Sequence, residues 1–472
     1  MLTRLEISGF KNIIDLQVDF GPFTCIAGAN GVGKSNVFDA IEFLSHLASE
    51  SLVEAAQQVR GPAGTRGADP RDLFWDGYRD HEHRITFAAE MIVPQDVEDD
   101  LGAPAKATTT FLRYELELGY SAAESASSVG RLTLLREELR HIIRGDAGKH
   151  LRFPHSAKNF RNAVILGRRS GGAFLSTGER DGAVVINVHG DGGSFGKPQP
   201  RPAARAGRTV LSTVTTNDYP TILAARREMQ SWRRLALEPS GLRAPDGFAD
   251  PRSMDSDGRH LAATLYRIAN DSAAGVDPDA VYARVADRLS DLSGVGASEL
   301  SVEPDQVREV FTLFLQDRAG LRLPARALSE GTLRFLALCV LLEDPTFTGL
   351  TCMEEPENGI HPANLPAMLD LVQDLAVDVG EAPGTDNPLR QVIINTHSPA
   401  VFQLCDPQDV LLAEVRPTRS AAGTITGGLT LLPFRNSWRS DPSHPSFDTA
   451  DVLAYLAAPA GAQLTLPVEV ER

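Results

Sequence analysis

A glycine-rich stretch at residues 28–35, GANGVGKS, fits the pattern G-x-x-x-x-G-K-[ST]. Its glycines would let backbone N–H groups face phosphate oxygens, Lys34 would neutralise those oxygens, and the Ser35 hydroxyl would ligate Mg²⁺. An apolar strand is expected at 23–27 and a helix at 36–48, which is the setting such a loop requires, although the pattern also occurs as a plain structural turn. We therefore predict a binding site for ATP and Mg²⁺, formed by Asn30, Gly31, Gly33, Lys34, Ser35 and Asn36.

A second stretch with chemical potential is LTCMEEPENGIHP, at residues 350–362. It predicts an apolar strand that ends in two carboxylates. Glu354 would hold a hydrated metal ion, and Glu355 would deprotonate an attacking water. By itself, a glutamate pair at a strand end is usually a solvated cap. The phosphate loop in the same chain favours the catalytic interpretation.

Two further motifs accompany these. A strand at 391–395 is followed by THSP, where His397 could contact a γ-phosphate or serve as a structural hydrogen-bonding group. The string LSEGTLRF at 328–335 precedes an apolar helix. Ser329 and Gly331, with free N–H groups at a helix N-terminus, would form a second anion site, or Ser329 would be only the helix cap.

Taken in this order, the four motifs resemble the ABC-type ATPases of the RecF/SMC/OLD group. The strings EEPENGIHP and THSP are most similar to the OLD-type (overcoming lysogenization defect) ATPases. The opening ISGFKN at residues 7–12 is similar to the start of such heads, where a pair matching Lys11 and Asn12 lies close to the nucleotide. The resemblance covers residues 1–140 and 320–415.

The resemblance implies an α/β fold: a P-loop NTPase head of the ABC type, with a mixed sheet, an antiparallel sheet and an inserted, partly helical subdomain. We expect an N-terminal lobe at 1–140, a basic and helical insert with a short arm at 141–310, and a C-terminal lobe at 311–472. ATP would lie between the loop of one head and Ser329 and Gly331 of another, so hydrolysis would require a homodimer or a higher oligomer.

Two features depart from the family pattern. OLD-type nucleases carry a TOPRIM domain after the ATPase, but only 73 residues follow Pro399, with no second acidic cluster in them. We therefore predict no nuclease in this chain, so that any cleavage would come from a separately encoded effector. The candidate for the family's Q-loop is residues 69–77, DPRDLFWDG, although it contains no glutamine.

Charge is distributed unevenly along the 472 residues. The formal net charge is −16, yet residues 136–234 hold 18 Lys and Arg against 8 Asp and Glu. This basic stretch favours contact with DNA or simply a soluble, loop-rich surface. A predicted helix at 220–237 carries four arginines: Arg226, Arg227, Arg233 and Arg234. They would either contact phosphate or lie on a solvated face of the helix. Trp232 would either stack on a base or pack inside the protein.

The rest of the sequence predicts further strands and helices, one disordered segment and the state of the cysteines. Strands are expected at 85–93, 111–120 and 131–139, and helices at 258–270 and 278–292, whereas 197–208, KPQPRPAARAGR, is the most disordered-looking piece. The four cysteines are far apart, which predicts buried free thiols.

No apolar run of about 20 residues is present, and the N-terminus has no signal-peptide pattern, so we expect a cytoplasmic protein with no membrane association. The resemblance to the RecF/SMC/OLD group implies a role in DNA repair or anti-phage defence. The rivals are an ATP-dependent sensor or scaffold that holds an effector without touching DNA, and the nucleotide-binding half of a transporter.

Overall fold

The chain folds into two compact units. The computed structural model describes residues 1–59, 69–76, 83–122, 130–167, 172–192, 198–203, 205–270, 277–293, 296–419, 423 and 425–452. Unit 1 comprises Met1–Trp232, Asp378–Pro383 and Pro407–Arg472, and unit 2 comprises Arg233–Val377 and Gly384–Asp406. The break after Trp232 lies inside the range expected to be one insert, so the units do not coincide with the three expected lobes.

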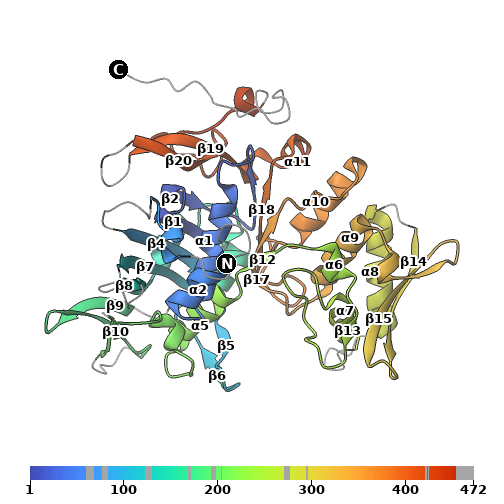
Figure 1. Cartoon of the computed structure of the whole chain (residues 1–472), viewed down its shortest axis with the longest axis horizontal. Helices are drawn as coiled ribbons and strands as arrows, with labels where there is room; N and C mark the ends of the chain where they lie inside the picture. The colour runs from blue at the N-terminus through green and yellow to red at the C-terminus, as the bar shows by residue number, and fades with distance from the viewer. Residues whose placement is uncertain are drawn as a thin grey trace. The chain divides into compact units, whose positions relative to one another are not determined.

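An eight-stranded antiparallel sheet dominates unit 1 (Figure 1). Its spatial order is β11-β10-β9-β8-β7-β4-β1-β2. The strands are β1 (Leu2–Phe10), β2 (Ile13–Asp19), β4 (Arg84–Ile92), β7 (Phe111–Ser121), β8 (Arg131–His141), β9 (Ala173–Arg180), β10 (Ala183–Val188) and β11 (Gln199–Pro202). The strands predicted at 85–93, 111–120 and 131–139 are therefore confirmed as β4, β7 and β8.

The Gly- and Arg-rich stretch after β8 extends this sheet. The expectation of disorder at 197–208 is wrong for β11, which pairs with β10 from Val185 to Val188. β11 is the edge strand and contains Pro200 and Pro202. Proline lacks a backbone N–H and is tolerated in a sheet on an edge strand, so this composition is compatible with strand structure at this position.

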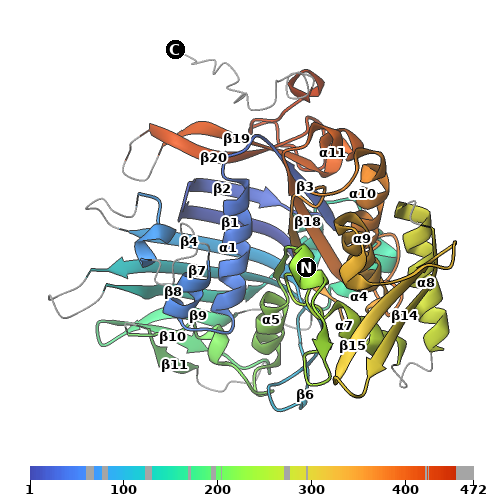
Figure 2. The ribbon, with the colours of Figure 1, turned by 45° about the vertical axis from the view of Figure 1, so that its right-hand side comes forward.

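One face of the sheet packs against α1 (Lys34–Leu47), as Figure 2 shows. The ring centroid of Phe43 on α1 lies 6.1 Å from that of Phe10 and 6.0 Å from that of Phe87. Side chains alternate between the two faces of a strand and paired residues share a face, so Ile7 on β1 and Leu116 on β7, which both pair with Phe87, lie on the face toward α1. The core of unit 1 therefore lies directly behind the helix that follows the phosphate loop.

The opposite face of the sheet carries a continuous ladder of ion pairs. Arg113 lies at its centre and contacts Glu6 at 2.7 Å, Glu90 at 3.1 Å and Glu115 at 2.8 Å. Arg136 continues the ladder by pairing with Glu115 at 2.6 Å. The arginines at the start of the basic stretch are thus neutralised within the sheet, so they do not form a free basic surface.

The other elements of unit 1 complete the frame around the phosphate loop. β3 pairs in parallel with β19, and β19 pairs antiparallel with β20. These elements are β3 (Phe23–Ala27), β19 (Val410–Arg419), β20 (Ile425–Pro433), the hairpin β5 (Asp96–Glu98) and β6 (Pro104–Lys106), and helices α2 (Leu52–Gln58), α3 (Ala147–His150), α4 (Asn162–Val164) and α5 (Pro220–Gln230). The mixed strands beside an antiparallel sheet agree with the predicted α/β fold class.

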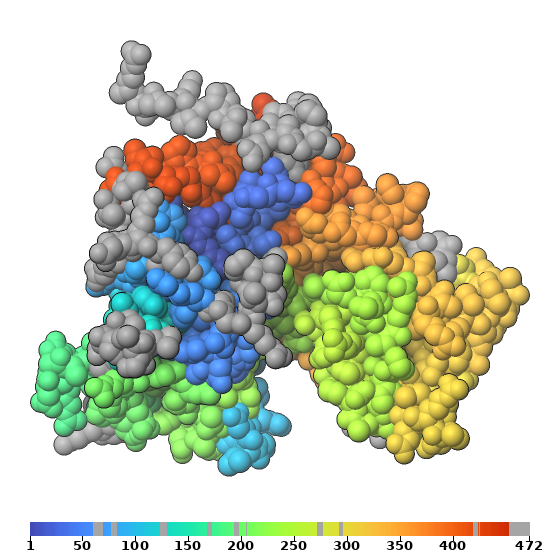
Figure 3. Space-filling model, in the orientation of Figure 1, coloured from blue at the N-terminus to red at the C-terminus, as the bar shows by residue number. Residues whose placement is uncertain are grey.

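Unit 2 contains two groups of strands with helices between them. β12 and β17 pair in parallel, as do β17 and β18, whereas β13, β14, β15 and β16 are joined by antiparallel pairs. The strands are β12 (Arg233–Leu235), β13 (Asp246–Gly247), β14 (Ala297–Asp305), β15 (Val310–Asp317), β16 (Arg322–Pro324), β17 (Gly349–Glu354) and β18 (Arg390–Thr396). The helices are α6 (Pro239–Leu242), α7 (Leu261–Ala269), α8 (Pro278–Ser293), α9 (Glu330–Glu343), α10 (Leu365–Asp374) and α11 (Pro399–Leu404). The surface of β14 and β15 appears in yellow in Figure 3.

The helices predicted at 258–270 and 278–292 are confirmed as α7 and α8. All four cysteines are buried and none of them forms a disulfide, as predicted. Within the described ranges, no helix is long and apolar enough to cross a bilayer.

Candidate functional site

The phosphate loop connects β3 to α1 in unit 1. Gly33 has a φ of 102°, in the left-handed region, and a Cβ there would lie 2.1 Å from the Asn12 side-chain nitrogen, so a larger residue cannot be accommodated. Lys34 is the buried first residue of α1, and its Nζ donates to the carbonyl oxygens of Gly28 at 2.7 Å and Ala29 at 2.8 Å. The loop therefore closes around the ammonium group, whereas the binding of phosphate by Lys34 stays a prediction.

Asn12 braces this loop from the turn after β1. Its Nδ2 donates to the Val32 carbonyl at 3.0 Å, and its Oδ1 accepts from Asn36 Nδ2 at 2.7 Å. Asn30 and Gly31 lie exposed at the tip, and Ser35, the second residue of α1, is half-buried. The structure thus gathers the predicted residues of the N-terminal motifs in one place.

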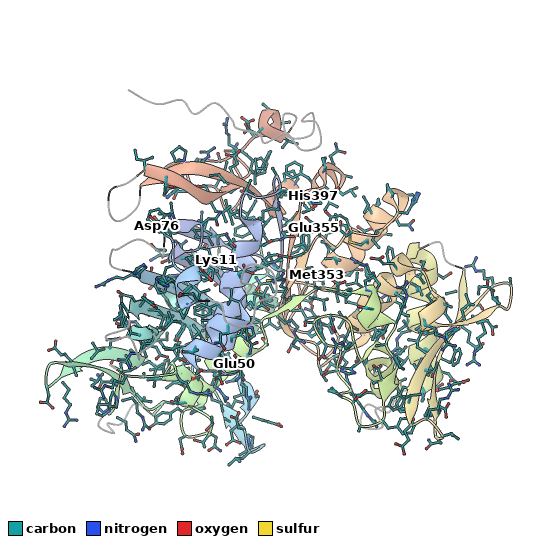
Figure 4. The ribbon with its side chains drawn as sticks, in the orientation of Figure 1. Lys11, Glu50, Asp76, Met353, Glu355 and His397 are labelled. Atoms are coloured by element: carbon teal, nitrogen blue, oxygen red, sulfur yellow. The ribbon has the colours of Figure 1, made fainter. Side chains whose placement is uncertain are left out.

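Lys11, labelled in Figure 4, has a positive φ of 48° and pairs with a residue that the motif analysis missed. Its Nζ lies 2.7 Å from Asp39 Oδ2, and Asp39 is 2% exposed. Asp39 follows Ser35 by four residues, so helical spacing places the two on one face of α1. That spacing was the available sequence signal.

The predicted Q-loop segment contacts the same turn. Asp69 caps a short 3₁₀ helix at Pro70–Leu73, and the Lys11 backbone N–H donates to the Leu73 carbonyl at 2.8 Å. Its described part, residues 69–76, therefore supports the position of Lys11. A Q-loop role for this segment stays a prediction.

In unit 2, the acidic motif lies at the carboxyl end of β17. β17 and β18 are parallel and paired from Gly349 and Arg390 to Glu354 and Asn395, so both strands end at the same edge. Glu355 follows with a φ of 45°, and its backbone N–H contacts both the carbonyl oxygen and Oδ1 of Asn395, at 3.0 Å and 3.1 Å. A non-glycine residue in this conformation is strained, and Asn395 holds it there.

The side chain of Glu355 is anchored at both oxygens. Its Oε1 lies 2.6 Å from His397 Nδ1, and its Oε2 accepts from Asn358 Nδ2 at 2.8 Å. Figure 4 labels Glu355 and His397 at this edge, together with Met353 of β17. The two residues predicted to be catalytic are therefore in direct contact, whereas Asn358 and Asn395 were not predicted.

Glu354, the predicted metal ligand, is paired with an arginine. Arg234 on β12 places its Nη2 3.1 Å from Glu354 Oε2, and the two side chains are 16% and 21% exposed. The parallel pairing of β12 with β17 brings Arg234 beside Cys352 and so close to the strand end. This contact joins residues that lie 120 positions apart in the sequence.

The helix predicted at 220–237 is shorter, and Arg233 and Arg234 lie on β12, so the alternative of a solvated helix is wrong for these two, whereas contact of the four arginines with nucleic-acid phosphate stays a prediction. α5 ends at Gln230, and Arg226 and Arg227 both pair with Asp100 at 2.8 Å. Arg233 lies 4.6 Å from the centroid of the Phe347 ring, and burial lowers its pKa. Trp232 packs inside and donates to Glu228 at 2.9 Å. These side chains are already engaged within the protein.

Ser329 is the N-cap of α9. Its Oγ accepts from the Thr332 backbone N–H at 3.1 Å, which is the role that the simpler interpretation of this motif predicts. Gly331 lies in the first turn of the same helix. A second anion site at Ser329 and Gly331 stays a prediction.

The donor set at the end of β17 fits Mg²⁺. Carboxylate oxygens are ligands that Mg²⁺ prefers, and this ion commonly uses one or two of them together with waters and substrate phosphates. In the part of the chain that the structure describes, no group of three or more His, Cys, Asp or Glu could hold a metal ion alone. The roles of Glu354 and of Ser35 as metal ligands stay predictions.

Comparisons with known proteins agree with the motifs. Residues 4–52 match a family model described as "AAA domain", and residues 190–402 match one described as "AAA domain, putative AbiEii toxin, Type IV TA system". The DNA replication and repair protein RecF of Phocaeicola vulgatus is 34% identical over 61 residues, which are 13% of this chain and 16% of that protein. RecF of Parabacteroides distasonis is 42% identical over 50 residues, 10% of this chain and 14% of that protein.

The structural maintenance of chromosomes protein 1 of Schizosaccharomyces pombe is 45% identical over 60 residues, which are 11% of this chain and 5% of that protein. The matches thus span only small parts of these relatives. Among solved structures, an SMC head bound to the C-winged helix domain of ScpA is 15% identical with a TM-score of 0.43, covering 91% of this chain and 98% of that chain. The SMC head domain from Thermotoga maritima is 12% identical with a TM-score of 0.35, covering 92% and 99%.

Proposed function

We propose that this chain, which matches AAA-domain family models and is similar to RecF proteins over a short stretch, is an ABC-type ATPase of the RecF and SMC group that binds Mg²⁺ and ATP and hydrolyses ATP to ADP and phosphate. The observation that carries the proposal is the anchoring of Glu355, whose two carboxylate oxygens contact His397 and Asn358 at the end of β17. A base must be held where it can take a proton from water, and a carboxylate fixed at both oxygens meets that requirement.

Each residue then has a separate role. The backbone of residues 28–35 and the Lys34 ammonium bind the phosphates, Glu355 accepts the proton of the attacking water, and His397 contacts the γ-phosphate. Mg²⁺, held by Ser35 and Glu354, would neutralise charge that develops on the phosphate oxygens.

We further infer that two copies of the chain, or a higher oligomer, form the active species. Ser329 and Gly331 at the N-terminus of α9 would contact the γ-phosphate held by another copy, since a helix N-terminus favours anions. ATP binding would then control assembly, and assembly would control contact with DNA or with a separately encoded nuclease of the OLD-like systems. The naming of the RecF relatives for replication and repair supports a role in DNA repair, whereas a role in anti-phage defence rests on the resemblance of EEPENGIHP and THSP to the OLD-type ATPases.

A second candidate is an ATP-dependent scaffold that holds an effector protein without touching DNA. It is favoured by the internal pairing of the basic residues, because Arg136 contacts Glu115, and Arg226 and Arg227 contact Asp100. Phosphate binding draws on cations that are free to replace counterions. Fewer such cations remain than the sequence composition suggests.

The test measures ATP turnover against protein concentration, with and without double-stranded DNA, together with the oligomeric state of the same samples. We expect turnover to rise more than proportionally with concentration, and Glu355→Gln to trap an ATP-bound oligomer. Lys34→Ala is the matched control that should lose ATP binding itself. Strictly proportional turnover with a fully active Glu355→Gln would refute the assignment, and stimulation by DNA would decide against the scaffold.

A further inference from the structure

Glu357, in the turn after β17, is a buried acidic residue that the proposed hydrolysis mechanism does not use. The residue is 8% exposed, and its Oε1 accepts a hydrogen bond from the Thr396 hydroxyl. Among the described residues, its Oε2 is buried without a hydrogen-bond partner. Burial raises the pKa of Glu357, and the bond from Thr396 only partly offsets this. Such a group is costly to bury, so its contact with Thr396 requires an explanation.

The Thr396 hydroxyl links Glu357 to the backbone around His397. Thr396 is fully buried at the end of β18. Its hydroxyl donates its single proton to Glu357 and accepts from the Ser398 backbone N–H at 2.9 Å. Because a hydroxyl has one donor, the bond to Glu357 directs its lone pairs toward Ser398. The backbone on both sides of His397 is therefore tied to one hydroxyl group.

His397 itself has little packing to hold it. Its side chain is 41% exposed, yet its Nδ1 lies 2.6 Å from Glu355 Oε1. An exposed ring keeps one orientation only when its backbone is fixed and its contact is geometrically defined. The turn at residues 396–398 supplies the fixed backbone.

We propose that Glu357 is a positioning residue, which acts through the Thr396 hydroxyl to hold His397 against the Glu355 carboxylate. Its role in ATP hydrolysis rests on the proposed function, whereas its effect on the His397 ring does not. A glutamine at 357 keeps an oxygen that can accept from Thr396, and a serine at 396 keeps the hydroxyl. Alanine at 357 and valine at 396 each break the link.

The first experiment records ring ¹H–¹⁵N spectra of the nucleotide-free protein labelled at histidine. The chain has 11 histidines, and the signals missing in His397→Gln assign residue 397. We expect Glu357→Ala and Thr396→Val to move the His397 ring signals toward their positions in Glu355→Ala. Glu357→Gln and Thr396→Ser should leave them at the native positions. A role confined to the stability of the turn would lower the melting temperature and leave the ring signals unmoved, which would overturn the proposal.

The second experiment measures steady-state ATP hydrolysis by the same variants. Loss of the link should lower kcat on the order of tenfold and change KM for ATP by less than about twofold, because misplacement of a catalytic group affects the chemical step more than binding. The two conservative variants should restore kcat. If the native chain does not hydrolyse ATP, the proposed function fails while the ring spectra still decide the role of Glu357. If Glu357→Ala does not fold, the comparison of Thr396→Val with Thr396→Ser decides it.

Discussion

Replacing Glu137 with glutamine should remove a pH dependence of stability from unit 1. Glu137 lies on β8, fully buried, and accepts from the backbone N–H groups of Val210 at 2.6 Å and Leu211 at 2.8 Å and from the Tyr114 hydroxyl at 3.1 Å. Burial raises its pKa from 4.5 to about 7, although these hydrogen bonds partly oppose the shift. The carboxyl therefore binds its proton more tightly in the folded chain than in the unfolded chain.

The sign and size follow from this difference. The stabilisation by the bound proton is fully present below pH 4.5, the unfolded pKa, and is lost as the pH rises through about 7. A shift of this size corresponds to roughly 3 kcal/mol in full, most of which falls between pH 5 and pH 8. Because glutamine does not titrate, the native chain should lose about 2 to 3 kcal/mol relative to Glu137→Gln over that interval. Any constant cost of the amide cancels in this comparison.

Urea unfolding followed by tryptophan fluorescence at pH 5, 6, 7 and 8 measures the effect. The three tryptophans, Trp75, Trp232 and Trp438, all belong to unit 1, so the signal reports on the unit that contains Glu137. Glu138→Gln is the matched control on the neighbouring position of β8. Burial opposes ionisation of Glu138, but hydrogen bonds and charges from Arg136 and Arg140 outweigh it and lower its pKa, so the control should show no such trend above pH 5. Parallel curves for the native chain and Glu137→Gln would refute the reasoning.

Three other variants test the remaining structural claims. Asn12→Ala removes the hydrogen bonds to Val32 and Asn36 and should weaken ATP binding by about tenfold, as titration calorimetry would measure; unchanged affinity would show that the loop needs no brace. Arg234→Gln removes a positive charge beside Glu354 and should tighten Mn²⁺ binding in the presence of ATP severalfold, whereas Arg234→Lys keeps the charge and should not. Electron paramagnetic resonance of free Mn²⁺ measures this binding, and weaker binding by the glutamine variant would contradict the prediction. Arg113→Met leaves the carboxylates of Glu6, Glu90 and Glu115 without this arginine and should lower the free energy of unfolding of unit 1 by about 2 kcal/mol in urea. A loss below about 0.5 kcal/mol would show that the ion pairs of Arg113 do not stabilise the sheet.

The phosphate loop shows what a sequence can reveal without a structure. Its functional groups are the backbone N–H groups, Lys34 and Ser35, which are contiguous, and the loop needs only a strand before it and a helix after it. The need for glycine at position 33 also comes from local geometry, because its φ of 102° lies in the region that favours glycine. Such motifs are predictable because short-range geometry suffices to define them. The order of the four motifs also indicated an ATPase, and residues 4–52 and 190–402 match family models described as AAA domains.

The charged side chains show what could not be predicted from the sequence. The sequence has 18 basic residues between 136 and 234, but this number does not reveal which of them are paired with acidic residues. Arg226 contacts Asp100 from 126 positions away, and Arg234 contacts Glu354 from 120 positions away. These contacts depend on α5 ending at Gln230 and on β12 pairing with β17, neither of which the helical spacing at 220–237 indicated.

The sequence by itself determined which groups could bind phosphate, hold a metal and activate water, because these are properties of residue type and short spacing. The tertiary structure alone decided that Glu355 contacts His397, that Thr396 joins Glu357, and that Arg226 pairs with Asp100. The physical reason is that burial and charge pairing are set by strands and helices that meet from distant parts of the chain. Their energetic effect therefore depends on a spatial neighbourhood that no local pattern encodes.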